Sequence, residues 1–280
     1  MGTIAYRLGP FPVPRQHGAW AMFLIPTFMA LAVARPWNWS SPVLAGAYVL
    51  VFLSHRPAGQ VVRAWGSRRS VDPSSLVWTL ILGGSGAGTV VILLAIHHVW
   101  IGFLLGILVG ATFGLHLRMT LHRRHMSTRG EMMGVFGLTA AGPLTYVFVQ
   151  GTLDPLGWFL WLINFLYFAG SVHYVKLKLR VQPSTTRPPV LGRFRPGLPS
   201  LVHSLVVLAV VSGITLVQGT SWLFVAAYGP FVLKVFTGVF RWQDKDSLHV
   251  TRFGFTELAH ALVFGTLATG AFLSPFSQVF

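Results

Sequence analysis

The sequence predicts an all-α, polytopic bundle of about nine transmembrane helices. Of its 280 residues 53% are hydrophobic and only 10% are charged, whereas a soluble globular protein carries roughly 25% charged residues. Apolar stretches of about 17 to 25 residues, the length that crosses a bilayer as a helix, recur between short polar segments. This composition excludes a soluble enzyme. Helices are expected because a backbone in lipid must satisfy its own hydrogen bonds.

Nine apolar stretches are predicted as spans, and together they make residues 1–280 a single integral membrane domain. The second stretch is the weakest, because Trp39 and Pro42 lie near its start and its apolar run is short. We expect this stretch to be tilted or partly interfacial. The spans are residues 18–34, 38–54, 76–95, 99–117, 132–151, 157–175, 199–218, 220–240 and 255–273.

The basic residues predict the orientation. All Lys and Arg except Arg35 and Lys234 lie before the first span or in the loops after spans two, four, six and eight. The positive-inside rule then places the N-terminus in the cytoplasm and the C-terminus outside. The net charge of +15 is thereby explained by topology, and no nucleic-acid partner is expected.

Histidine shows the same asymmetry. Of the 11 histidines, only His97 and His98 fall on the outer side of this topology. Together with the arginines, the others predict a cationic cavity that opens to the cytoplasm between the helix ends. The alternative is that each imidazole simply lies among the lipid head groups.

One polar stripe runs along the span at 157–175. Asn164, Tyr167, Ser171, Tyr174 and Lys178 follow one another at spacings of three and four residues, which places them on one helical face. Such a face lines either an interface between helices or a cavity, and the sequence leaves both interpretations open.

Lys234 lies inside the span at 220–240, one turn after Gly229 and Pro230, which are expected to break that helix. An ionisable residue at this depth is a functional candidate by default. Its predicted partners are Glu131, Glu257 or an anionic ligand. Either carboxylate also fits the start of a helix, where it complements the helix dipole.

A glycine row in the span at 99–117 predicts close helix packing. Gly102, Gly106, Gly110 and Gly114 recur at every fourth position, a pattern that lets two helices approach to backbone contact. The packing would hold Arg118, the next residue in this row, against a partner helix.

These observations predict a cavity that binds an amphipathic anion such as a lipid phosphate or an isoprenoid-like carboxylate. Membrane lipids and this small molecule are the expected partners, no protein partner is indicated, and catalysis is left open. The chain has no cysteine and no paired carboxylates within a span, so neither a metal site nor a cofactor is predicted. The predicted ligand-binding residues are His17, His55, Arg56, Arg118, His173, Tyr174, Lys234 and Arg241, with Glu131 and Glu257 as counter-ions.

Two alternative functions remain open. An anion transporter or proton-coupled transporter would use Lys234 and the Gly-Pro break at the midpoint of its pathway. A haem-binding or assembly subunit of a respiratory complex would use His173, His203 and His260 as axial ligands.

Several motifs carry a family resemblance. The run RQHGAWAMFLIP at 15–26, supported by HRP at 55–57, RGEMMG at 129–134 and FTELAHAL at 255–262, resembles the YwiC-like family of bacterial membrane proteins. The resemblance implies a multi-pass protein of the bacterial cytoplasmic (inner) membrane and gives no reaction.

The predicted layout is more distantly similar to the UbiA-type intramembrane prenyltransferases. The basic loop and Gly/Pro-rich helix at 116–146 carry this likeness. Those enzymes hold Mg²⁺ and diphosphate with aspartate-rich motifs, where this sequence reads SHRPAGQVVRAW at 54–65 and AGSVHYVKLKLR at 169–180. The resemblance therefore implies anion binding through cations rather than metal-assisted ionisation.

Overall fold

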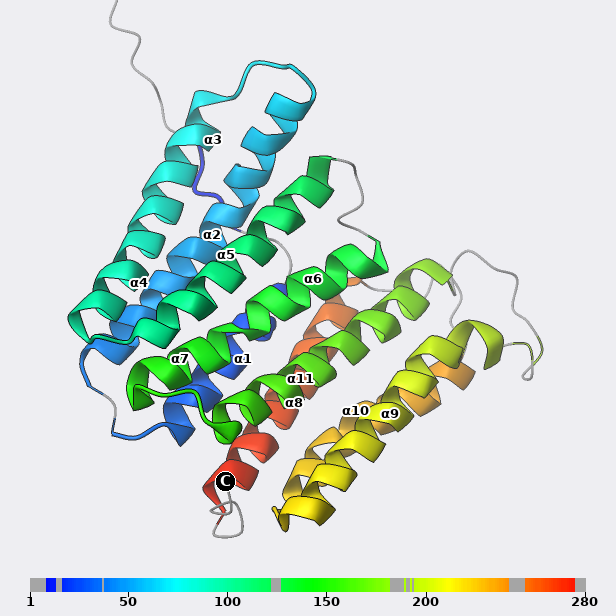
Figure 1. The fold of residues 1–280 in the computed structure, drawn as a ribbon. Helices are drawn as coiled ribbons and strands as arrows, with labels where there is room; N and C mark the ends of the chain where they lie inside the picture. The colour runs from blue at the N-terminus through cyan, green and yellow to red at the C-terminus, as the bar shows by residue number, and fades with distance from the viewer. Residues whose placement is uncertain are drawn as a thin grey trace, which may run out of the picture. The chain divides into compact units, whose positions relative to one another are not determined.

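A computed structural model shows a protein built of helices. It describes residues 9–13, 17–36, 38–121, 127–181, 189, 192, 194–241 and 250–274, and these contain no strand. The helices, labelled in Figure 1, are α1 (His17–Val33), α2 (Ser40–Gly66), α3 (Pro73–Trp78), α4 (Ser85–Ile96), α5 (Trp100–Leu121), α6 (Thr128–Thr139), α7 (Ala141–Gln150), α8 (Pro155–Lys176), α9 (Phe194–Gln218), α10 (Leu223–Phe240) and α11 (Val250–Leu273). Two π-helical segments, η1 (Thr79–Gly84) and η2 (Leu177–Val181), continue α3 and α8.

The all-α, polytopic fold class is confirmed. Within the described ranges, seven helical segments are long and apolar enough to cross a membrane: 73–96, 100–121, 128–150, 155–179, 194–218, 223–240 and 251–273. The apolar part of α1, Gly18–Val33, is shorter. α2 is long enough, but its second half carries Arg56 and Arg63. The protein is thus a multi-pass membrane protein, while the count of nine spans and the orientation stay predictions.

The prediction differs most from the structure at the end of α2 and in the stretch at 132–151. α2 continues to Gly66, about three turns beyond the predicted end at 54, because Pro57, Ala58 and Val61 keep its inner face buried. The stretch predicted at 132–151 divides into α6 and α7 at Ala140, just before Gly142 and Pro143. Proline has no N–H to continue the ladder of backbone bonds.

The expected break in α10 is wrong. The helix runs from Leu223 to Phe240 through Pro230. Pro230 withdraws a single backbone donor, and the neighbouring turns hold the helix across it.

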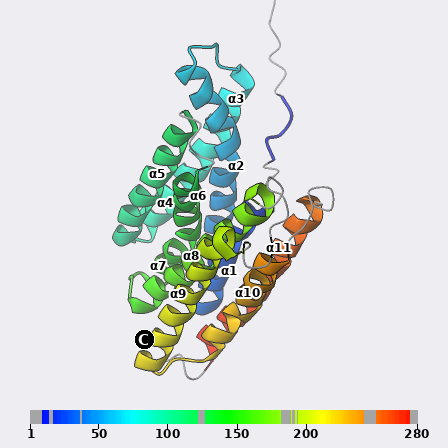
Figure 2. The same cartoon turned by 90° about the vertical axis from the view of Figure 1, so that its right-hand side faces the viewer.

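The described chain forms two compact units. Unit 1 is Met1–Gln16, Ala34–Gly137 and Leu144–Thr152, and unit 2 is His17–Val33, Leu138–Pro143 and Leu153–Phe280. In unit 1, α2 packs against α3, η1, α4 and α5 (Figure 1). In unit 2, α11 packs against α1 and α10, and α9 packs against α8 and α10 (Figure 2).

The N-terminal segment of unit 1 is fastened to α3. The amide of Gly9 donates to Ser74 Oγ at 2.9 Å, and Trp78 Nε1 donates to the Gly9 carbonyl at 3.2 Å. Phe11 meets the Trp78 ring edge-on, with centroids 5.2 Å apart. α3 itself begins at a cap, because the Asp72 carboxylate accepts from the amides of Ser74 and Ser75. The Ser75 hydroxyl and these amides stabilise the charged carboxylate and so lower the pKa of Asp72.

Aromatic rings fill the core of unit 2. Tyr167 stacks on Phe264 with ring centroids 4.0 Å apart, and Phe159, Phe224 and Phe272 meet edge to face. Most of these rings are almost fully buried. Their contacts fix the helix that carries the polar stripe, α8, against α10 and α11.

Exposed tryptophans mark the beginnings of four helices. Trp39, Trp100, Trp158 and Trp222 lie at or next to the starts of α2, α5, α8 and α10, and each is at least 46% exposed. Tryptophan is enriched where a membrane protein meets the bilayer interface. Since tryptophan is enriched at both interfaces, these residues mark helix ends, and the orientation stays a prediction from the charge pattern.

Candidate functional site

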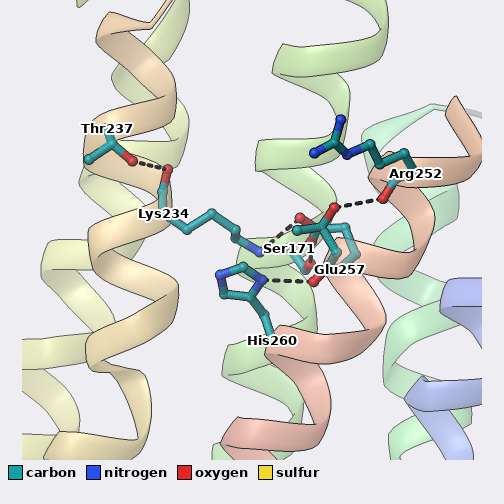
Figure 3. A network of polar contacts seen from close by, with 7 residues as sticks. Ser171, Lys234, Thr237, Arg252, Glu257 and His260 are labelled. Atoms are coloured by element: carbon teal, nitrogen blue, oxygen red, sulfur yellow. Dashed lines mark hydrogen bonds and ion pairs between the residues drawn. The ribbon is translucent and has the colours of Figure 1, made fainter. Parts of the chain in front are cut away.

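A buried ion pair joins α10 and α11 in unit 2. Lys234 Nζ lies 3.0 Å from Glu257 Oε1 and 2.8 Å from Oε2. The two side chains are only 8% and 10% exposed. Ser171 of α8 donates its hydroxyl to Glu257 Oε2 at 2.7 Å, so three helices meet at one carboxylate (Figure 3).

Aromatic rings enclose the cation of this pair. Lys234 Nζ lies 4.9 Å from the ring centroid of Tyr174 and 5.3 Å from that of Phe231. A ring face attracts a cation through its quadrupole, most strongly where water is excluded. The rings therefore add to the attraction that Glu257 exerts on the ammonium, and the ion pair as a whole is neutral.

The donors form an anion-binding arrangement, and the anion that they hold is the Glu257 carboxylate of the same chain. Lys234 supplies a charged donor that contacts both oxygens of one carboxylate, and Ser171 supplies a neutral donor to one of them, Oε2. Charge-assisted hydrogen bonds of this type are the stronger class. The sequence left three possible partners for Lys234 open, and the structure pairs it with Glu257.

The polar stripe of α8 is buried inside unit 2 along its length. Asn164, Tyr167, Ser171, Tyr174 and Lys178 are each at most 8% exposed. The stripe therefore forms an interface with neighbouring helices, one of the two interpretations that the sequence left open. The site depends on Ser171, which was not among the predicted binding residues, although its place in this stripe was a signal that could have found it.

Lys178 closes the end of α10. Its Nζ donates to the carbonyls of Gly238 at 2.7 Å and of Arg241 at 2.9 Å. The last carbonyls of a helix lack partners within the helix, and a cation there also complements the helix dipole. The ammonium of Lys178 thus serves the chain's own backbone, while Arg241, which begins the next segment, is exposed.

Two polar atoms of the stripe have no hydrogen-bond partner among the described residues. They are Asn164 Oδ1 and the hydroxyl of Tyr167, both fully or almost fully buried. The amide nitrogen of Asn164 is satisfied, because it donates to the Leu160 carbonyl at 2.8 Å. Buried polar atoms are rarely left unpaired, so these two atoms are places for a water molecule or a ligand group.

Two histidines of unit 2, His203 and His260, contact backbone carbonyls. The rings of His173 and His203 lie 5.5 Å apart, and His203 Nε2 lies 2.9 Å from the Leu166 carbonyl. His260 Nδ1 lies 2.7 Å from the Thr256 carbonyl of its own helix. Among the described residues, no three histidine or carboxylate side chains come together as metal ligands.

Unit 1 brings a second pair of histidines together. The rings of His55 and His116 lie 5.2 Å apart, and His116 Nδ1 lies 3.2 Å from the Gly130 carbonyl. Arg56 donates from Nη1 to the Val13 carbonyl at 3.0 Å. The sequence placed His116 on the cytoplasmic side without including it among the binding residues, since nothing in the spacing pairs it with His55.

The predicted binding residues divide between the units. His55, Arg56, Arg118 and Glu131 belong to unit 1, and the others belong to unit 2. Arg118 is exposed, and Glu131 lies in the first turn of α6. The following predicted positions lie outside the described residues: the side chain of His17, and all of Arg15, Gln16, His122, His125 and His249.

The glycine row of α5 makes only one of its predicted contacts. A Cβ on Gly102 would lie 2.5 Å from Leu94, but within the described chain nothing lies within 4 Å of such an atom on Gly106, Gly110 or Gly114. The predicted helix packing is therefore wrong for these three glycines. Most of α5 is exposed, since only 11% of its most apolar part is buried.

Comparison with known proteins finds a family that resembles the first half of the chain. The model of the YwiC-like protein family matches residues 13–146. Over this segment the chain is similar to the YwiC-like family. It is also similar to the "Uncharacterized protein YwiC" of Bacillus subtilis (strain 168), with 26% identity over 172 residues that cover 60% of this chain and 67% of that protein. No solved structure matches the chain.

The match to the YwiC-like family covers α1 to α6 and part of α7. The motifs at 15–26, 55–57 and 129–134 lie inside it. Lys234 and Glu257 lie beyond it, so their pairing rests on the structure. The UbiA-type likeness is not addressed by these matches and stays a prediction.

Proposed function

We propose that this YwiC-like protein resides in the bacterial cytoplasmic membrane and binds an amphipathic anion. The anionic head, a phosphate or a carboxylate, is held by Lys234 and Ser171, and the tail lies along apolar helix surface. The predicted orientation puts the site toward the cytoplasmic side. Lys234 is six residues, or ~9 Å, from Phe240, the last residue of α10.

One observation carries the proposal. Lys234 and Ser171 already bind a carboxylate, that of Glu257, at distances of 2.7 to 3.0 Å. Donors that hold a carboxylate of the protein are correctly spaced for the carboxylate or phosphate of a ligand. Tyr174 and Phe231 beside the ammonium supply apolar surface for the first carbons of a tail.

The histidine pair of unit 1 supports the same chemistry independently. His55 and His116 face each other at 5.2 Å, and the exposed Arg56 follows His55 directly. Protonated imidazoles and guanidiniums bind phosphate and carboxylate oxygens. This pair forms a second place for an anionic head.

Direct binding tests the proposal. The full chain, purified in neutral detergent, is titrated with dioctanoyl phosphatidic acid and with decanoate, which present a phosphate and a carboxylate, and with decanol as an uncharged control. We expect both anions to bind and decanol not to bind at matched concentration. Lipids retained on protein isolated from native membrane, identified by mass spectrometry, should be enriched in anionic species.

Two variants locate the binding. Lys234→Gln should weaken anion binding by about 10-fold or more, since a hydrogen bond to a charged group contributes roughly 1.5–3 kcal/mol. Ser171→Ala keeps the ion pair and should weaken binding several-fold, which guards against misfolding of the first variant. Lys176→Gln, on the same helix as Ser171, is the matched control and should bind as the natural protein does. Equal binding of anions and decanol, or equal affinity in all three variants, would contradict the proposal.

A further inference from the structure

We infer that Glu257 is an internal competitor for the anion site, and that an incoming anion displaces it from Lys234 while Glu257 takes up one proton. This inference rests on the proposed function and adds a second ligand, the proton, whose site is the Glu257 carboxylate. The protein would then bind its anion together with a proton.

The geometry requires the exchange. The Glu257 carboxylate accepts hydrogen bonds from both donors of the site. Lys234 donates to each of its oxygens, and Ser171 donates to Oε2. The pair is buried, with side-chain exposures of 8% and 10%. A second anion at the same ammonium would place two negative charges beside one positive charge with little water to screen them. Two anionic groups that share one ammonium in a buried site are not both ionised, because their repulsion is poorly screened.

Charge balance sets the stoichiometry. Before exchange the site holds one ammonium and one carboxylate and is neutral. After exchange it holds the ammonium and the ligand anion and is neutral again if the displaced carboxylate is protonated. One O–H bond forms on Glu257, the proton comes from solvent, and no other covalent bond changes.

The protonated carboxyl has acceptors within the same face of α8. The Tyr167 hydroxyl and Asn164 Oδ1 are buried and have no partner among the described residues. They lie about one and two turns from Ser171, at ~6 Å and ~10 Å along the helix. A carboxylic acid donates one hydrogen bond that a carboxylate does not. The nearer of the two, the Tyr167 hydroxyl, accepts it directly or through a water molecule, which gives this unpaired atom a role.

The ionisable groups around Glu257 are the other possible sites for the proton. From α10 it faces Lys234, and from α8 it faces Tyr167 and Tyr174. α1, which also packs on α11, carries no ionisable side chain between Gly18 and Val33. On α11 itself, Arg252 and His260 flank it (Figure 3). Of these groups only His260 is an imidazole, so the test includes it.

Proton uptake on binding is the measurement. Decanoate stays ionised between about pH 6.5 and 8.5, as ordinary carboxylates do. It is added to the full chain in weakly buffered neutral detergent with a pH-sensitive dye. We expect about one proton taken up per decanoate bound, and affinity that falls up to 10-fold for each unit rise in pH. Glu257→Gln should bind more tightly than the natural protein above pH 7, with no uptake and no pH dependence, while His260→Gln should keep the uptake.

An infrared difference spectrum of the natural protein provides a readout that needs no variant. Binding of decanoate should convert one side-chain carboxylate band into the carbonyl band of a protonated carboxylic acid. Binding with neither proton uptake nor this band would overturn the inference while leaving the proposed function in place. Loss of uptake in His260→Gln, with uptake retained in Glu257→Gln, would also overturn it. Absence of binding to both the natural protein and Glu257→Gln would instead refute the proposed function.

Discussion

Gly86 of α4 lies directly against the backbone of Ala47 in α2. A Cβ on Gly86 would stand 2.7 Å from the Ala47 carbonyl oxygen and 2.9 Å from the Val51 amide nitrogen. Backbone atoms of a packed helix cannot rotate away as the end of a side chain can. The two helices of unit 1 therefore depend on the missing side chain at this position.

The first prediction concerns this contact. Gly86→Ala should destabilise the protein by about 1–3 kcal/mol, the usual cost of adding a methyl group to a packed interface. Gly88→Ala is the matched control two residues along the same helix, where nothing lies within 4 Å of the new atom. It should leave stability unchanged or raise it by up to ~1 kcal/mol. Thermal unfolding of both variants in one detergent makes the comparison, and equal loss in both would show that the close approach is unimportant.

The second prediction concerns the lysine that ends α10. Lys178→Met should remove two hydrogen bonds to the Gly238 and Arg241 carbonyls and cost roughly 1.5–3 kcal/mol. Lys178→Arg keeps the charge and donors and should retain much of that stability. Hydrogen exchange should show faster opening of the last turn of α10 in the methionine variant. Unchanged exchange there would mean that the lysine does not hold this helix end.

The third prediction concerns orientation. The chain has no cysteine, so a single introduced cysteine is the only thiol. Ser67 follows α2 and Thr152 follows α7, and both are exposed. A membrane-impermeant maleimide should label Thr152→Cys in intact spheroplasts, and Ser67→Cys only after permeabilisation. The opposite result would invert the orientation derived from the basic residues.

Much of the helical architecture could be predicted from local sequence. Each apolar stretch became a helix because length and hydropathy are properties of neighbouring residues. The end of α2 at Gly66 could not be predicted, because its second half is held by packing of Pro57, Ala58 and Val61 rather than by a long apolar run. The continuity of α10 through Pro230 could not be predicted either. The rule that proline breaks a helix does not include the hydrogen bonds of the turns on either side, which hold this helix together.

The sequence predicted several residues of the candidate site but not how they are arranged. Tyr174 and Lys234 were predicted as binding residues, whereas Ser171 was predicted only as part of the polar stripe of α8. Which carboxylate meets Lys234 is set by how α10 and α11 pack, so periodicity alone left Glu131 and Glu257 equivalent. The glycine row in α5 predicted packing that the described chain does not show. Small residues permit another helix to approach closely, but they do not determine whether one lies there.

The strap formed by residues 9–13 places a condition on biogenesis. Its anchors, Ser74 and Trp78, belong to the third helix, so the ribosome must have made more than 78 residues before the strap can dock. Until then the first two helices must enter the translocon without it. The order of synthesis and the order of assembly therefore differ at this end of the molecule.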